Sequence, residues 1–253
     1  MVLLLHGFCE SPAIFDGLIP ALADRYRVVC PVLPGHAGLA WDDTLATISD
    51  LADWLKRFLD SLEVESCYLV GHSLGGYIAA AMAERHPGRL TGVCMLHSTA
   101  LEDPAVRQEN RNKSLAFIGR FGTKPFLKAF VDSLFYESPE ASGMGRLQEW
   151  KAELAAITSQ VDPEAIMALT MAMRDRPSRL REVQASGVPF TYVIGEHDSL
   201  VTAERSAMEF QDWEDAKVIH LQGVGHMAMY EAREELIQVL LQILPKKDQI
   251  STQ

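Results

Sequence analysis

One fifteen-residue stretch organises the chain: SCYLVGHSLGGYIAA, residues 66–80. An apolar run, a glycine-rich turn and an alanine-rich segment follow one another, which predicts a strand, a tight turn and a helix. Gly71, Ser73 and Gly75 fit the Gly-x-Ser-x-Gly spacing of a strained turn that carries a serine at its tip. Strand and helix nearly touch beside that serine, so only glycine fits two residues before and after it. The helix N-terminus offers N–H groups to a developing anion, and we predict Ser73 as a nucleophile.

Composition places the chain among ordinary globular proteins. Its 253 residues are 48% hydrophobic and 23% charged, enough for one large domain or for a domain with an insertion. The net charge of −11 argues against nucleic acid or an anionic membrane as a partner. Four widely spaced cysteines without a C-x-x-C pair indicate reduced thiols. The apolar N-terminus is too short for a signal peptide and no run reaches transmembrane length, so we expect a cytoplasmic protein.

Apolar strands alternate with amphipathic helices in both the first and the last part of the chain. We expect strands at Val2–Leu5, Arg27–Cys30, 66–70, Thr91–Leu96, Pro189–Ile194 and Ala216–Leu221, and helices at about 11–22, 45–62, 74–86, 202–210 and 230–244. This α/β alternation predicts a mostly parallel six-stranded sheet with helices on both faces. The second strand, Arg27–Cys30, and the last strand, Ala216–Leu221, should form its edges. Ligands should bind at the carboxyl ends of the strands.

The alternation stops between the fourth and fifth strands. Residues 99–186 show helical patterns and no convincing strand, which predicts an inserted helical cap between two parts of the core, 1–98 and 187–253. The plainer alternative is that these helices cover a face of the sheet. The phenylalanines of this segment and four methionines favour an adaptable apolar pocket, or a core between cap helices. The methionines are Met144, Met167, Met171 and Met173.

Five short motifs now give the chain a family resemblance. They are His6-Gly7, Pro34-Gly35-His36, Gly71-His72-Ser73-Leu74-Gly75-Gly76, Gly195-Glu196-His197-Asp198 and Gly223-Val224-Gly225-His226. With them the chain resembles the α/β-hydrolase superfamily, in its lid-bearing branch of small carboxylesterases and related serine hydrolases. Many relatives carry two further strands before the first one here. Because the first edge of the sheet would then be uncovered, a homodimer formed along that edge is a hypothesis.

The resemblance implies a Ser-Asp-His order for the catalytic groups. A serine hydroxyl needs a base, and the base needs an orienting acid. His226 lies where the superfamily places its base, just past the last strand, and Asp198 lies where it places its acid. Glu102 or Asp103 is a minor alternative for the acid. Four other histidines are read as structural: His220 within a strand, His36 in a loop, His6 bracing the turn after the first strand, and His72 packing at the serine turn.

Main-chain groups complete the predicted site. The resemblance assigns the oxyanion hole to the backbone N–H groups of Phe8 and Leu74, which explains why neither position needs a polar side chain. Gly7 would give the freedom that aims the Phe8 N–H. The sequence shows neither a metal-ligand cluster nor a dinucleotide fingerprint, and acyl transfer needs neither, so we expect no cofactor.

The type of nucleophile narrows the chemistry. Haloalkane dehalogenases and epoxide hydrolases of this superfamily use aspartate at the turn, whereas this chain has Ser73. We therefore expect hydrolysis of a small or medium, apolar carboxylic ester through an acyl-serine intermediate. Other chemistry with the same triad stays open, namely that of an aminopeptidase, a C–C bond hydrolase or a lyase. A ligand-binding or signalling protein that keeps the triad is the alternative from a different class.

Overall fold

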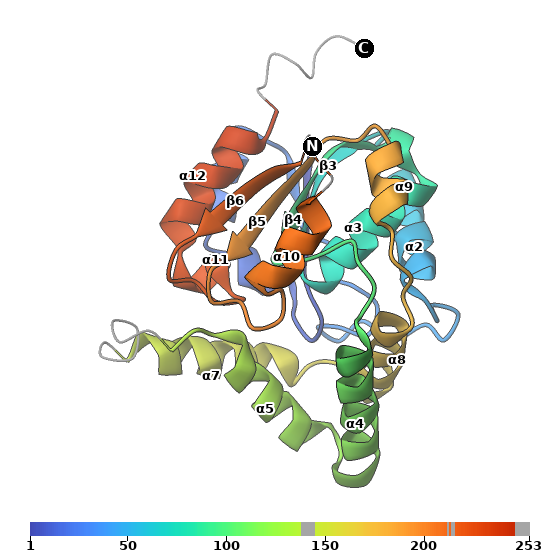
Figure 1. Cartoon of the computed structure of the whole chain (residues 1–253), viewed down its shortest axis with the longest axis vertical. Coiled ribbons are helices and arrows are strands. Elements are labelled where there is room, and N and C mark those ends of the chain that lie inside the picture. Colours follow the sequence, from blue (N-terminus) through green and yellow to red (C-terminus); the bar gives the residue numbers. More distant parts are fainter. Residues whose placement is uncertain (138–144, 212, 214–215, 246–253) are drawn as a thin grey trace.

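A six-stranded sheet forms the centre of the computed structural model, which describes residues 1–137, 145–211, 213 and 216–245. The strand order is β2-β1-β3-β4-β5-β6 and every neighbouring pair is parallel (Figure 1). The strands are β1 (Val2–Leu5), β2 (Val28–Val29), β3 (Cys67–His72), β4 (Leu90–Leu96), β5 (Phe190–Gly195) and β6 (Lys217–Leu221). The predicted parallel sheet and both of its edges are confirmed.

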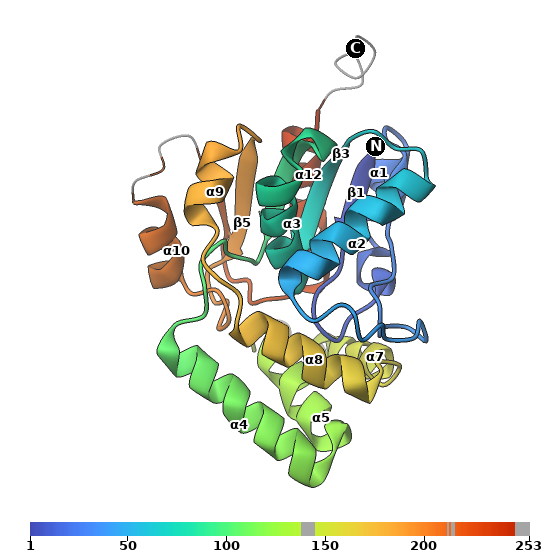
Figure 2. The same ribbon diagram turned by 90° about the vertical axis from the view of Figure 1, so that its right-hand side faces the viewer.

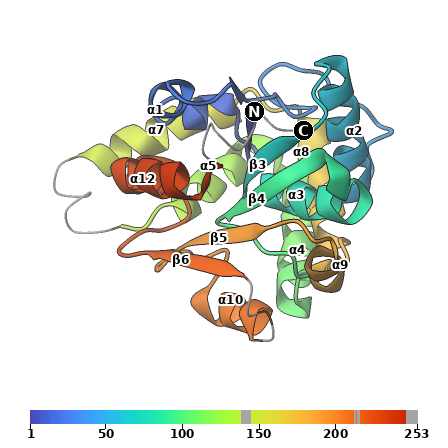
Figure 3. The ribbon, with the colours of Figure 1, turned by 90° about the horizontal axis from the view of Figure 1, so that it is seen from above.

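The side chains of the strands contribute to two hydrophobic cores, one on either face of the sheet. In β1, Leu3 and Leu5 belong to one core while Val2 and Leu4 belong to the other, because successive strand residues point to opposite faces. Viewed from above, α2, α3, α9 and α10 cover one face, and α1 and α12 cover the other (Figure 3). These helices are α1 (Ile19–Ala23), α2 (Ile48–Ser61), α3 (Leu74–Arg85), α9 (Leu180–Ala185), α10 (Ala203–Phe210) and α12 (Arg233–Ile243).

Three predicted helices have different limits in the structure. The helix expected from residue 45 begins at Ile48, because Thr47 caps it and shares a capping box with Asp50. The helix expected over 11–22 is split into a short 3-10 helix, η1 (Pro12–Phe15), and α1. The helix expected over 230–244 is likewise divided into α11 (Ala228–Glu231) and α12, because Ala232 has a non-helical backbone with φ −141° and ψ 46°.

Five of the described helices lie between β4 and β5, and the first four of them form what we call the helical insertion. They are α4 (Ala105–Phe121), α5 (Thr123–Leu134), α7 (Arg146–Thr158) and α8 (Pro163–Arg174). The insertion stands beneath the carboxyl ends of the strands, while α9 returns to the sheet (Figures 1 and 2). The division of the chain into segments 1–98, 99–186 and 187–253 stays a prediction. Met144 lies outside the described residues.

The outer surfaces add two observations. At the β2 edge the strand is only two residues long, so it offers little backbone for pairing with a second chain, and the homodimer stays a prediction. No helix among the described residues is long and apolar enough to cross a membrane.

Candidate active site

Ser73 lies alone between the end of β3 and the start of α3. Its φ of 51° and ψ of −113° are strained for a residue with a side chain. A Cβ added to Gly71 would come within 3.0 Å of the backbone of Gly75. A Cβ added to Gly75 would likewise collide with the carbonyl oxygen of Leu5. Backbone contact therefore requires glycine at both positions, which is the reason inferred from the sequence.

Asp198 and His226 meet at the carboxyl edge of the sheet. They follow the neighbouring strands β5 and β6, and the Nδ1–H of His226 donates to Oδ2 of Asp198 at 2.8 Å. The other carboxylate oxygen accepts the backbone N–H groups of Leu200 and Val201 at 2.8 and 2.9 Å. Both side chains are buried. The structure thus brings together two of the three side chains predicted from the sequence.

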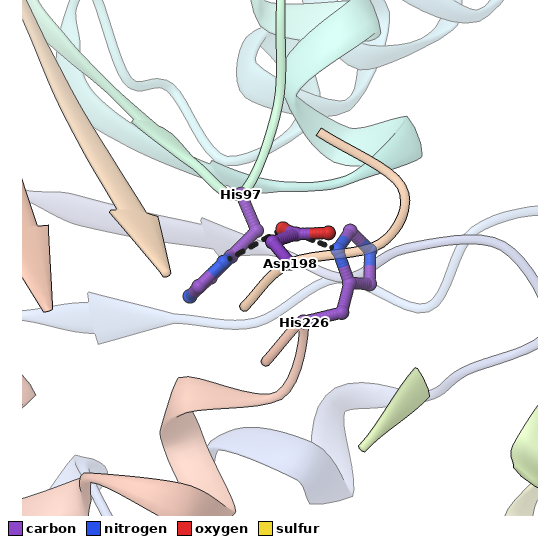
Figure 4. A group of neighbouring side chains, drawn as sticks. All are labelled: His97, Asp198 and His226. Atoms are coloured by element: carbon purple, nitrogen blue, oxygen red, sulfur yellow. Dashed lines mark hydrogen bonds and ion pairs between the residues drawn. The ribbon is translucent and has the colours of Figure 1, made fainter. Parts of the chain in front are cut away.

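A second imidazole binds the same carboxylate. His97 follows β4, and its Nδ1–H donates to Oδ2 of Asp198 at 3.0 Å, so the carboxylate lies between two histidines (Figure 4). Burial acts to raise the pKa of Asp198, but His226 and His97 outweigh it and hold that pKa well below its usual range. Burial lowers the pKa of His97 to about 4. Asp198 is therefore an anion at neutral pH and His97 is uncharged.

The sequence reasoning did not single out His97. The available signal was its place directly after a buried strand at the carboxyl edge of a parallel sheet, next to the strand that leads to Asp198. His97, Asp198 and His226 also offer ligand atoms within 4.8 Å of one another, as a metal site would. Both Nδ1 atoms, however, already donate to Asp198, so we assign the group to hydrogen bonding rather than to metal binding.

His72 links the serine turn to the loop that carries His226. Its Nε2–H donates to the backbone carbonyl of His226 at 3.0 Å, and its Nδ1 lies 2.9 Å from Oε2 of the buried Glu10. Burial acts to lower the pKa of His72, but the Glu10 carboxylate and these hydrogen bonds raise it. The same carboxylate oxygen accepts the Gly7 N–H at 2.6 Å. A chain of buried polar contacts therefore joins the turn after β1 to the loop of His226, a role that sequence reasoning missed for Glu10.

The turn after β1 holds the predicted oxyanion groups. The Leu33 N–H donates to Nε2 of His6 at 3.1 Å, and Nδ1–H of His6 donates to the Gly7 carbonyl at 3.0 Å. His6 therefore braces this turn, as the sequence suggested. Among the described residues, the backbone N–H groups of Phe8 and Leu74 have no hydrogen-bond acceptor. Both groups remain available to a ligand, and their oxyanion role stays a prediction.

A cavity of about 290 Å³ lies between Ser73 and the helical insertion. It is lined by Phe8, Ser73, Tyr77, Arg107, Asn110, Arg111, Ser114, Phe126, Phe130, Thr170, Met173, Ser199 and Leu200. Of the methionines predicted for such a pocket, Met173 is among these residues. Met167 and Met171 instead line a separate hollow beside Trp41. Among the phenylalanines and methionines of the insertion, the expectation of an apolar pocket therefore holds for Phe126, Phe130 and Met173, and it missed the two arginines.

Asp103, one of the two alternative acids, has other partners than His226. Asp103 is buried and its carboxylate binds Arg111 and Arg176. Arg176 in turn lies over the ring of Tyr77, 3.8 Å from its centre. Burial acts to raise the pKa of Asp103, but the two guanidinium groups hold it below its usual value. Asp103 is thus engaged by cations, and the residue that binds His226 is Asp198.

A parallel sheet with a strained serine turn after β3 defines the class of α/β hydrolases. The chain belongs to the alpha/beta hydrolase family, whose model matches residues 2–239. This family is enzymatic, and the resemblance drawn from the motifs is confirmed.

The sequence identity to individual relatives is low. The chain is 26% identical over 251 residues to the dihydrolipoyllysine-residue acetyltransferase component of the acetoin cleaving system of Pseudomonas putida, covering 97% of this chain and 63% of that protein. It is 26% identical over 253 residues to the pimeloyl-(acyl-carrier protein) methyl ester esterase of Aeromonas hydrophila, covering 94% and 93%. A thermophilic esterase from Thermogutta terrifontis has a TM-score of 0.85 at 24% identity, covering 95% of this chain and 88% of that one, which shows the shared fold.

Proposed function

We propose that the chain is a serine hydrolase that cleaves a small or medium carboxylic ester. Ser73 is the nucleophile, His226 the base and Asp198 the acid that orients the base. The observation that carries this proposal is the His226 ring. Its Nδ1 is held by Asp198 at 2.8 Å, while its buried Nε2 has no partner within the described part of the chain. Buried polar atoms normally have a partner, and a serine hydroxyl or its proton would supply one.

The proposed reaction has two steps. In acylation, Ser73 Oγ attacks the ester carbonyl as Nε2 of His226 takes its proton, and Asp198 stabilises the imidazolium that forms. The oxyanion is held by the Phe8 and Leu74 N–H groups. Nε2 then gives the proton to the leaving alcohol. In deacylation water attacks the acyl group, its proton passes through His226 to Ser73 Oγ, and the acid leaves.

Similarity supports ester chemistry without choosing a substrate. The Aeromonas relative is named an esterase, as is the Thermogutta structure, whereas the Pseudomonas relative is an acetyltransferase component. The cavity beside Ser73 is about 290 Å³, just below the roughly 300–1,000 Å³ usual for ligand pockets. This size favours a short substrate.

The test is hydrolysis of p-nitrophenyl acetate, butyrate and octanoate by the wild type and by Ser73→Ala. We expect turnover by the wild type and a loss on the order of 10⁵-fold or more in kcat for Ser73→Ala. Ser159→Ala, at an exposed serine in α7's C-terminal turn, is the matched control and should behave as the wild type.

A fluorophosphonate probe separates the possible failures. Labelling of Ser73 without ester turnover would keep the triad and reject these esters as substrates. A chain that neither turns over esters nor reacts with the probe would contradict the proposal and favour a ligand-binding protein.

A further inference from the structure

One face of α4 brings polar and positively charged side chains to the cavity beside Ser73. Arg107, Asn110, Arg111 and Ser114 are spaced at i, i+3, i+4 and i+7, so they share one side of the helix, and all four line the cavity. Phe126 and Phe130 of α5 line it as well, and Phe8 packs edge-to-face against both rings. The cavity therefore combines a polar, cationic wall with apolar surfaces.

The charges of this wall are not balanced. Asp103 is shared by Arg111 and Arg176, so one carboxylate faces two guanidinium groups. Arg107 is half-buried and has neither a hydrogen-bonded acceptor nor an ion-pair partner for its side chain among the described residues. No acidic side chain from the described residues lines the cavity. The surplus of positive charge is notable in a chain with a net charge of −11.

The pKa of a neighbouring arginine, Arg205, is affected by these charges. The pKa of Arg205 in α10 is lowered first by burial and then by the charge of Arg176, with a smaller contribution from Arg107, while Glu102 and Glu209 act to raise it. A set of like charges beside a partly enclosed cavity is unfavourable without a ligand. An anion placed in the cavity would relieve this repulsion.

We propose that the arginine wall formed by Arg107 and Arg111 binds a carboxylate of the substrate, so that the preferred substrate is a short ester that also carries a free carboxylate. The inference rests on the proposed ester hydrolysis at Ser73 and names the substrate class of that site. Guanidinium groups match carboxylates by paired N–H donors, and such charge-assisted bonds are stronger than neutral ones. The apolar surfaces would contact the methylene groups between the ester and the carboxylate.

The first experiment compares pairs of esters in which one member carries a carboxylate where the other carries a methyl group. Monomethyl glutarate is paired with methyl pentanoate, which places the carboxylate on the acyl side, and 4-acetoxybutanoate is paired with butyl acetate, which places it on the alcohol side. We expect kcat/KM to be about 10- to 100-fold higher for the anionic member of at least one pair. The pair that shows the preference identifies the side of the ester that faces α4. Equal or lower kcat/KM for both anionic esters would overturn the inference.

The second experiment assigns the preference to Arg107. Arg107→Gln should reduce the ratio of kcat/KM between anionic and neutral ester by about 10-fold or more. Arg120→Gln removes an exposed arginine from the same helix, outside the cavity, and should leave that ratio unchanged. Loss of the ratio in the Arg120→Gln control as well would indicate a general surface-charge effect and contradict the proposed site.

A binding measurement distinguishes failure of this inference from failure of the proposed function. Calorimetric titration of the Ser73→Ala protein with glutarate and with the neutral glutaramide needs no catalysis. Preferential binding of glutarate that weakens about 10-fold in Ser73→Ala/Arg107→Gln would support the carboxylate site even if no ester were cleaved. Ester hydrolysis without any preference for glutarate over glutaramide would keep the proposed function and reject the site.

Discussion

The serine turn and the helical insertion differ in how much room their glycines have for a side chain. At the turn, Gly71 and Gly75 have no room for a methyl group because backbone faces backbone. In the insertion, Gly119 in the last turn of α4 has open space where a side chain would be. The cavity therefore joins a rigid part that holds the reacting groups to a part whose side chains can vary without disturbing the sheet.

This difference suggests a division of roles. Substitutions in the core should change folding or the rate for every ester alike. Substitutions of cavity residues in the insertion should change which ester is preferred. The following predictions test that division.

The largest effect should come from adding one methyl group to the serine turn. Gly75→Ala would push a Cβ into the carbonyl oxygen of Leu5 and should prevent accumulation of folded protein. The matched change Gly119→Ala should leave stability unchanged or raise it by up to about 1 kcal/mol, because alanine favours a helix. Soluble yield and thermal unfolding measure both. A folded Gly75→Ala protein with the wild-type unfolding temperature would contradict the claim that the serine turn has no room for a methyl group.

Next in size is the loss of the carboxylate that orients His226. Asp198→Asn should lower kcat by about 10⁴-fold for every ester tested, because the amide cannot hold the same tautomer of the ring. Asp175→Asn, at an exposed aspartate after α8, serves as the control and should leave kcat unaffected. A loss confined to one class of ester would mean that Asp198 contributes to selectivity, contrary to the division proposed above.

A smaller effect is expected in the pH dependence of stability. Residues 99–186 contain no histidine, so any histidine that titrates belongs to the rest of the chain. The pKa of His97 falls from 6.5 to about 4 on folding, so between these pH values the unfolded chain binds a proton that the folded chain does not. The free energy of unfolding should therefore be highest above pH 6.5 and should fall as the pH is lowered from 6.5 to 4. The loss that is due to His97 should be at most about 3 kcal/mol.

Urea unfolding across that window measures the loss. His97→Asn keeps an N–H donor for Asp198 but does not titrate, so its stability should depend less on pH. The exposed His220 in β6 provides the control variant His220→Asn, which should follow the wild type. Identical pH dependence for His97→Asn and the wild type would reject this role.

The smallest predicted effect concerns the contacts through Glu10. Glu10→Gln replaces the charged acceptor shared by Gly7 and His72, and should cost about 1–2 kcal/mol in the free energy of unfolding. Because the change lies in the core, kcat/KM should fall by a similar factor for anionic and neutral esters. Glu65→Gln, at an exposed position before β3, is the control. A change in ester preference in Glu10→Gln would contradict the division between the two regions.

Much of this arrangement could be predicted because it depends on local pattern. Alternating apolar strands and amphipathic helices predicted the sheet and its edges, and the spacing of Gly71, Ser73 and Gly75 predicted the turn. The helix limits near Ala232 and Ile48 were missed by a few residues, since caps and backbone breaks depend on individual dihedral angles.

The class of protein and the candidate triad could be predicted from the sequence, because both follow from motifs at the ends of predicted strands. The three-dimensional structure was needed to show that His97 shares the carboxylate of Asp198 and that Glu10 contacts His72, 62 residues away. The same holds for the finding that Arg107 and Arg111 line the same cavity as Ser73. The physical reason is that these contacts join residues far apart in the chain. Their partners are chosen by how the insertion and the strand ends pack, and no local periodicity records that choice.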